Sequence, residues 1–171
     1  RRAFGASVVA EYGLAETQSM VRTRFAPRVA AQSFLCLALM VLAACVPTVQ
    51  RAGSPLDGFT GPRFEPAAER FISFDGAELG LTAWLPPNNA EPRAVIIGLH
   101  GMNDYANTFY LAGPWFAARG VAVFAYDARG FGRSPRRGVW AGERLMTEDL
   151  RTAVMVARHT YPNAEIVVVG D

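Results

Sequence analysis

A continuous apolar segment, residues 94–99 (Ala-Val-Ile-Ile-Gly-Leu), is followed at once by His100 and Gly101. Its length and its β-branched residues are typical of a strand that is buried on both faces of a sheet. A polar turn, Asn103-Asp104, and then a helical pattern come next. A buried strand that ends at a glycine and leads into a helix is the position at which open α/β sheets bind ligands. The sequence therefore predicts an α/β fold with its candidate site at the end of this strand.

The remaining segments repeat the order of strand, turn and helix. Two alternating segments, residues 69–74 and 79–85, flank Asp75-Gly76 and predict an antiparallel hairpin. The other expected elements are buried strands at residues 121–126 and 165–169 and helices at residues 106–119 and 143–161. Pro114 lies inside the first helical pattern, so the helix can also begin only there. Right-handed crossovers would make a parallel sheet with helices on both faces.

The front of the chain, residues 1–45, has the pattern of a targeting region. Met20 is the expected start, and three arginines precede an apolar run at residues 29–44. As a helix this run would span about 24 Å, less than the roughly 30 Å of a bilayer's hydrocarbon core. It ends in Leu-Ala-Ala followed by Cys45, which resembles a bacterial lipobox, in which the cysteine is lipidated. An uncleaved membrane anchor and an ordinary signal with a chance cysteine are the alternatives.

These features predict a membrane-anchored lipoprotein of the bacterial cell envelope, either facing the periplasm or in the outer membrane. Residues 46–66 are rich in proline and glycine and are interpreted as a linker, and residues 67–171 as the domain. A net charge of +2 gives no indication of a nucleic-acid partner. Both cysteines, Cys36 and Cys45, precede the domain, so no disulfide is expected within it. No Cys/His cluster indicates a metal, and no cofactor is expected.

Three motifs in order resemble the α/β-hydrolase fold, in its monoacylglycerol lipase, lysophospholipase and serine aminopeptidase S33 branch. They are residues 100–104 (His-Gly-Met-Asn-Asp), residues 127–134 (Asp-Ala-Arg-Gly-Phe-Gly-Arg-Ser) and Asp149-Leu150 with the strand that follows. The resemblance covers residues 68–171. It implies that the Met102 N–H, next to Gly101, is one donor of an oxyanion hole.

The resemblance also implies a G-x-S-x-G nucleophile elbow after the last strand. The sequence supplies Gly170 and Asp171, so the nucleophile is expected at the next position, with the acid and the histidine further on. The residue two before a nucleophile must be small, and Val169 is too large for Asp171 to serve. We therefore expect this sequence, as the N-terminal part of a hydrolase, to be inactive alone.

Four further polar residues of the motifs are expected to support the site rather than react. His100 is expected to be structural, since the family's catalytic histidine comes late in the chain. Asp127 and Arg129 are expected to brace a loop through a salt bridge or turn hydrogen bonds. Asp104 is expected to cap the following helix or to brace the oxyanion turn.

The predicted activity of the parent protein is hydrolysis of carboxylic esters, small-molecule or monoacyl-lipid, through a Ser-His-Asp mechanism. Its predicted partners are that ester substrate and, through the lipid anchor, a membrane. Two alternatives stay open. One is a non-catalytic envelope binding protein on the same fold. The other is a hydrolase with an aspartate nucleophile, of the epoxide hydrolase or dehalogenase type.

Overall fold

The computed structural model describes residues 49–55 and 57–170. The predictions for residues 1–45, the lipobox cysteine Cys45 among them, lie outside the described residues. Within the described part of the chain, no helix is both long and apolar enough to cross a membrane.

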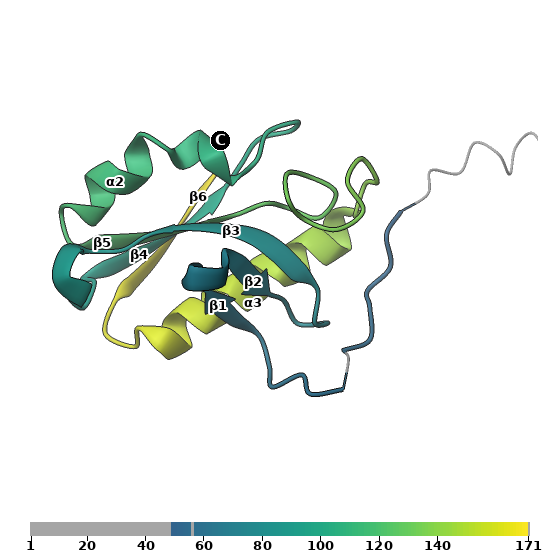
Figure 1. The fold of residues 1–171 in the computed structure, drawn as a ribbon, viewed down its shortest axis with the longest axis horizontal. Helices are drawn as coiled ribbons and strands as arrows, with labels where there is room; N and C mark the ends of the chain where they lie inside the picture. Colours follow the sequence, from purple (N-terminus) through teal and green to yellow (C-terminus); the bar gives the residue numbers. More distant parts are fainter. Residues whose placement is uncertain (1–48, 56, 171) are drawn as a thin grey trace, which may run out of the picture. The chain divides into compact units, whose positions relative to one another are not determined.

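A single mixed sheet organises the described part of the domain (Figure 1), in the order β1-β2-β3-β5-β4-β6. The predicted hairpin is present as β2 and β3, which pair antiparallel, and β3 also pairs antiparallel with β5. β4 is central to a parallel group and pairs with both β5 and β6. The bounds are β1 Arg63–Glu65, β2 Arg70–Ile72, β3 Glu78–Trp84, β4 Ala94–Leu99, β5 Val121–Tyr126 and β6 Glu165–Gly170.

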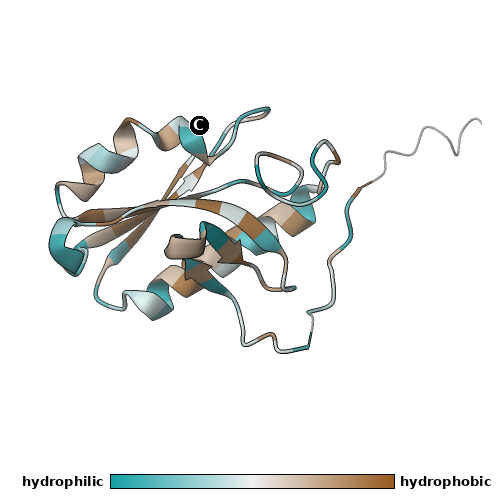
Figure 2. Ribbon diagram, viewed as in Figure 1, coloured by the Kyte–Doolittle hydropathy of each residue, from teal (hydrophilic) through white to brown (hydrophobic). Residues whose placement is uncertain are grey.

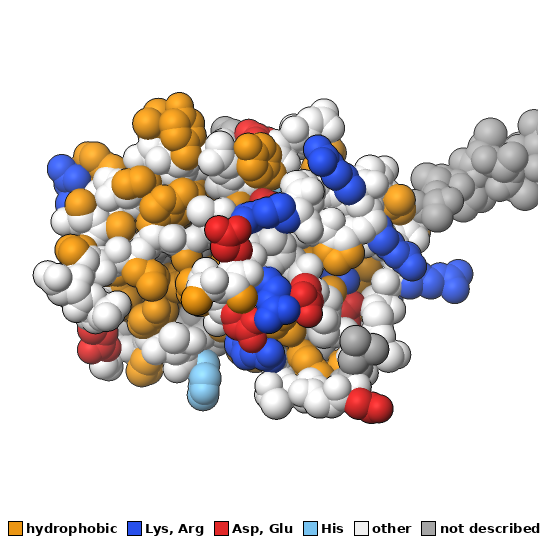
Figure 3. Space-filling view, in the orientation of Figure 1, with side chains coloured by type: hydrophobic (Ala, Val, Ile, Leu, Met, Phe, Trp, Pro, Cys, Tyr) orange, Lys and Arg blue, Asp and Glu red, His pale blue; other side chains and the backbone are white. Residues whose placement is uncertain are grey.

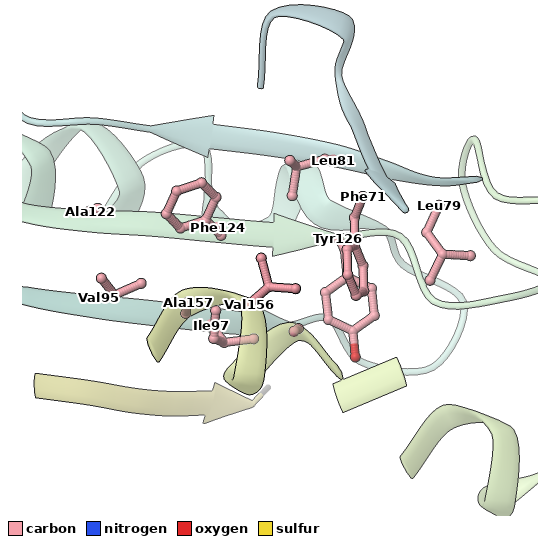
Figure 4. Close-up of a cluster of buried hydrophobic side chains, with 11 residues drawn as sticks. Phe71, Leu79, Leu81, Val95, Ile97, Ala122, Phe124, Tyr126, Val156 and Ala157 are labelled. Atoms are coloured by element: carbon pink, nitrogen blue, oxygen red, sulfur yellow. The ribbon is translucent and has the colours of Figure 1, made fainter. Parts of the chain in front are cut away.

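Helices cover both faces of this sheet, as predicted (Figure 1). On one face α3 (Glu143–Thr160) packs its apolar stripe against alternate residues of β3, β4 and β5 (Figure 4). On the other face lie the 3₁₀ turn η3 (Ala106–Phe109) and the short helix α2 (Ala112–Ala117). Figure 2 shows the corresponding concentration of hydrophobic residues along the strands. Two short 3₁₀ turns, η1 (Pro66–Ala68) and η2 (Pro87–Asn89), flank the hairpin.

The helix expected at residues 106–119 is divided into η3 and α2. Pro114 is the third residue of α2, a position whose N–H has no intrahelical partner, so proline fits there. The missing N–H of Pro114 therefore costs α2 no helical hydrogen bond, and the helix can begin just before the proline. The helix expected at residues 143–161 and the strand at residues 165–169 each differ from the structure by one residue at one end.

Several residues of the segment predicted as a linker, 46–66, contact the domain. Residues 63–65 form β1 and pair with β2, because Phe64 stacks on Phe124 with ring centroids 4.5 Å apart and also contacts Phe71. Aromatic pairs of this kind add to the stabilisation from burial. Gln50 donates its side-chain amide to the Val139 carbonyl at 2.6 Å. Residues 63–65 and Gln50 are therefore part of the folded domain.

A substitution at Gly98 in β4 would test how tightly η3 packs on the sheet. A methyl group at Gly98 would lie 2.8 Å from Cε2 of Phe109, whereas one at Gly170 in β6 meets nothing within 4 Å. We expect Gly98→Ala to destabilise the chain by about 1–3 kcal/mol through overpacking. Urea denaturation of Gly98→Ala and of the control Gly170→Ala checks this, and equal midpoints for the two variants would contradict it.

Candidate functional site

The turn after β4 presents a backbone N–H group to the carboxyl end of the sheet. The Asp104 N–H donates to the Gly101 carbonyl at 3.2 Å and closes the turn, and Asn103 takes a φ of 66°, which asparagine tolerates. The Met102 side chain is 69% exposed, and among the described residues nothing accepts a hydrogen bond from the Met102 N–H. This N–H is therefore available to a ligand oxygen.

His100 joins this turn to the loop after β5. Its Nε2 accepts the Ala128 N–H at 2.9 Å, so the other ring nitrogen, Nδ1, carries the proton and donates to the Gly101 carbonyl at 2.8 Å. Both nitrogens are engaged in the neutral ring. His100 therefore positions the turn through both ring nitrogens.

Asp127 is completely buried and ties three segments together. Its Oδ1 accepts the Ala106 N–H at the start of η3 at 2.7 Å. Its Oδ2 accepts the Arg133 backbone N–H at 2.8 Å and the Arg133 Nε–H at 3.0 Å. Gly132, with a φ of 49°, lies against this carboxylate, and a Cβ there would overlap it. The role of Asp127 is to hold the loop and η3 beneath the turn.

Arg129 forms a separate buried network and makes no ion pair with Asp127. The Arg129 guanidinium donates to both oxygens of Asp149 on α3, at 2.7 and 2.8 Å. It also donates to both oxygens of Asp75 in the hairpin turn, at 2.9 and 2.7 Å. Asp149 additionally accepts the Ser73 hydroxyl at 2.5 Å. Asp127 and Arg129 brace the loop through different partners because their side chains point to different elements.

The charges of this network stabilise one another. Burial by itself would raise the pKa of Asp75, but hydrogen bonds from Arg129 and from the Gly53 and Ala77 N–H groups outweigh burial and lower that pKa. Burial would likewise lower the pKa of Arg129, and the two carboxylates raise it instead. Tyr126, on the neighbouring strand, has a raised pKa, first because of burial and second because of the Asp149 charge. Arg129 is therefore charged at every pH at which the protein folds.

Asp104 and Gly170 complete the list of predicted site residues. Asp104 accepts the Tyr105 N–H at 2.8 Å, so it braces the turn, and it makes no side-chain cap to η3. Gly170 ends β6 and lies opposite Leu99 in the parallel register. The carboxyl end of β6 is therefore beside the turn that carries Met102. This is where chemistry would be expected in an open α/β sheet.

A pocket of about 320 Å³ opens next to this turn, at the carboxyl ends of β4 and β5. Apolar side chains make up most of its wall, including Leu99, Trp140, Met146 and Leu150. The described residues contain no group of three or more His, Cys, Asp and Glu side chains that could hold a metal ion. The pocket is suited to an apolar ligand group.

Comparisons with known proteins relate this chain to a known family. The sequence pattern of the family described as "Serine aminopeptidase, S33" matches residues 90–171. The crystal structure of a soluble variant of monoglyceride lipase from Saccharomyces cerevisiae matches with a TM-score of 0.51 at 20% identity, over 73% of this chain and 39% of that chain. The chain belongs to the α/β-hydrolase superfamily.

Two curated relatives show how much of such a protein this chain spans. The monoacylglycerol lipase of Mycolicibacterium smegmatis is 31% identical over 58% of this chain and 35% of its own length. The Escherichia coli protein named "Uncharacterized protein YfhR" is 30% identical over 71% of this chain and 44% of its own length. The chain thus spans less than half the length of these relatives. Its similarity to the lipase places it with the monoacylglycerol lipase-like branch of the superfamily.

The sequence-based predictions did not include the partners of Arg129 in this domain. Asp75 was interpreted only as a turn residue, and Asp149 only as part of a helix motif. One signal was available: Asp149 lies four residues after Leu145 and four before Ala153, on the buried stripe of α3. A carboxylate on an apolar stripe requires a cationic partner, and Arg129 is the one buried arginine among the described residues.

Removing Arg129 is expected to cost about 3–5 kcal/mol of unfolding free energy, because it leaves two buried carboxylates without a counter-charge. We expect this loss for Arg129→Gln, measured by urea denaturation. The control is Arg151→Gln, which breaks the exposed pair with Glu148 and is expected to cost less than about 1 kcal/mol. Similar losses for the two variants would show that the buried network is not a major source of stability.

The lowered pKa of Asp75 gives a pH dependence with a definite sign. An aspartate with a lowered folded-state pKa contributes stability that is fully present above its unfolded value of about 3.9 and is lost as the pH falls through the folded value. We therefore expect Asp75→Asn to be less stable than wild type at pH 6 and to lose less stability between pH 4 and pH 2.5. Urea midpoints across this range check the slope. The exposed Asp57→Asn is the control, and a slope in Asp75→Asn as steep as in wild type would contradict the assignment.

Proposed function

We propose that the protein is a carboxylic-ester hydrolase with a serine nucleophile, acting on monoacyl lipids of the monoacylglycerol or lysophospholipid type. The observation that carries this proposal is the pairing of Leu99 with Gly170, which sets the carboxyl end of β6 beside the Met102 N–H. A nucleophile presented just after β6 would attack a carbonyl whose oxygen can reach this donor. Acyl transfer needs that arrangement, because its tetrahedral intermediate carries an oxyanion.

The nucleophile of the proposed enzyme is the residue after Asp171, within the elbow of the family resemblance. The described serines with buried hydroxyls are committed elsewhere: Ser73 donates to Asp149, and Ser134 donates to the Asp127 carbonyl. His100 has both ring nitrogens engaged, and His159 is exposed in the last turn of α3. Residues 1–171 expressed alone are therefore expected to show no esterase activity.

The proposed substrate class rests on two features. The pocket beside the turn has a mainly apolar wall, which fits an acyl chain. The chain is also similar to a protein named monoacylglycerol lipase. We further propose that lipidation of Cys45 anchors the enzyme in the bacterial envelope, on the strength of the arginines, apolar run and Leu-Ala-Ala-Cys sequence described above. Such an anchor would keep the enzyme near lipid substrates.

The expected behaviour of the full-length protein is labelling by a fluorophosphonate probe and hydrolysis of a monoacylglycerol. Within it, Met102→Pro removes the proposed oxyanion donor, and we expect kcat to fall about 10²–10³-fold. Steady-state kinetics with a soluble ester measures this loss.

Met102→Leu is the matched control, because it changes the exposed side chain and keeps the N–H. It is expected to retain the wild-type kcat. Equal activity of the proline and leucine variants would contradict the role of the N–H. Absence of probe labelling in the full-length protein would reject the serine mechanism and favour the binding protein or the aspartate nucleophile.

A further inference from the structure

A short segment before the sheet, residues 49–54, is fixed to the loop that follows β5. We call this segment the strap. The Gln50 N–H donates to the Trp140 carbonyl at 3.0 Å, and the Gln50 side-chain amide donates to the Val139 carbonyl at 2.6 Å. The Gly53 N–H donates to Asp75 at 2.8 Å. Gln50 is 7% exposed. The strap is therefore part of the folded domain and fixes where the chain enters it.

Four exposed arginines lie on or beside the strap: Arg51, Arg136, Arg137 and Arg144. Arg51 and Arg136 line one hollow beside the strap, and Arg51 and Arg144 line another. None of the four belongs to an ion pair within the described part of the chain. We call these four residues, with the exposed Trp140, the arginine surface. Figure 3 shows Arg side chains projecting at this end of the domain.

The acidic residues near this surface do not neutralise it. Glu148 lines one of the hollows but pairs with Arg151, and Asp75 is buried against Arg129. Glu143 is exposed beside Arg144 and forms no ion pair among the described residues. The surface therefore has a positive excess, although the net charge of the whole chain is only +2.

The sequence places this surface close to the proposed lipid attachment. Three residues, 46–48, separate Cys45 from Val49. Fully extended, the chain from Cys45 to Val49 spans at most about 14 Å. The Debye length at physiological salt is about 8 Å, and a tether this short lets the arginines approach a charged bilayer to within that distance. Anionic headgroups attract arginines at such distances, and tryptophan favours the interface.

We propose that the arginine surface docks the domain onto the anionic phospholipid headgroups of the bilayer in which the chain is anchored. The inference rests on the membrane anchoring proposed above and names the partner of this face. Trp140 also lines the pocket beside His100, so docking here would hold that pocket close to the headgroups. A lipid substrate would then reach the site from the same membrane.

Hydrogen exchange in proteoliposomes tests the proposal. The full-length protein is reconstituted in vesicles of phosphatidylglycerol with phosphatidylethanolamine, or of phosphatidylcholine alone, and exchange of the amides of residues 136–142 is measured by mass spectrometry. We expect exchange in the phosphatidylglycerol vesicles to be about fivefold slower or more. The difference should disappear in 0.5 M salt and in Arg136→Glu/Arg137→Glu.

The matched control is Arg93→Glu/Arg158→Glu, which makes the same change in charge near the amino ends of the parallel strands. It should keep the lipid-dependent protection. Equal exchange in the two kinds of vesicle would overturn the proposal. The proposal would also be overturned if polyglutamate, added to protein in phosphatidylcholine vesicles, slowed exchange as much as phosphatidylglycerol does. The surface would then bind polyanions in general.

Hydrogen exchange also distinguishes docking by the arginine surface from the proposed ester hydrolysis and from the proposed lipidation of Cys45. Ester hydrolysis is assayed independently of exchange, so loss of one says nothing about the other. The mass of the N-terminal peptide reports whether Cys45 is acylated. Lipid-dependent protection without acylation would support the arginine surface and reject only the chemistry of the anchor.

Discussion

The bridge that Arg129 makes between Asp75 and Asp149 is the interaction on which the arrangement of this domain depends. It connects the hairpin turn, the loop after β5 and helix α3, three segments that the sheet alone does not hold together. Burying three charges is expensive, and the expense is offset only because every guanidinium bond is short and both carboxylates have further donors. Such a network tolerates few alternative arrangements. It therefore specifies where α3 begins relative to the hairpin.

The reactive end of the sheet is built on a second set of bonds that do not react. Histidine and aspartate often act as a base and an acid in active sites. Here the polar atoms of His100 and Asp127 are instead occupied by hydrogen bonds with backbone groups. Their effect is to hold one free N–H, that of Met102, at the carboxyl end of β4. A hydrogen-bond donor contributes most to catalysis when it is already in place before charge develops. The buried polar residues of the two loops supply that preorganisation.

Much of this was predictable from the sequence because it depends on local pattern. The buried strands, the hairpin, α3 and the alternation of faces follow from hydrophobic periodicity, and the turn after β4 follows from its motif. The pairing of β1, in contrast, depends on a contact distant in sequence, that of Phe64 with Phe124. The partners of Arg129 were missed for the same reason: Asp75 and Arg129 are 54 positions apart. Charge alone does not show which of several carboxylates an arginine reaches.

The pairing of Leu99 with Gly170 has a consequence for the order in which the protein forms. During synthesis β4 can pair with β5 soon after both leave the ribosome, whereas its other edge waits until α3 and β6 have been made. Closing the longer loop costs more chain entropy. The turn with the free N–H is thus complete before the strand that approaches it arrives. A nascent chain would carry half of its candidate site, already shaped, for as long as translation of α3 takes.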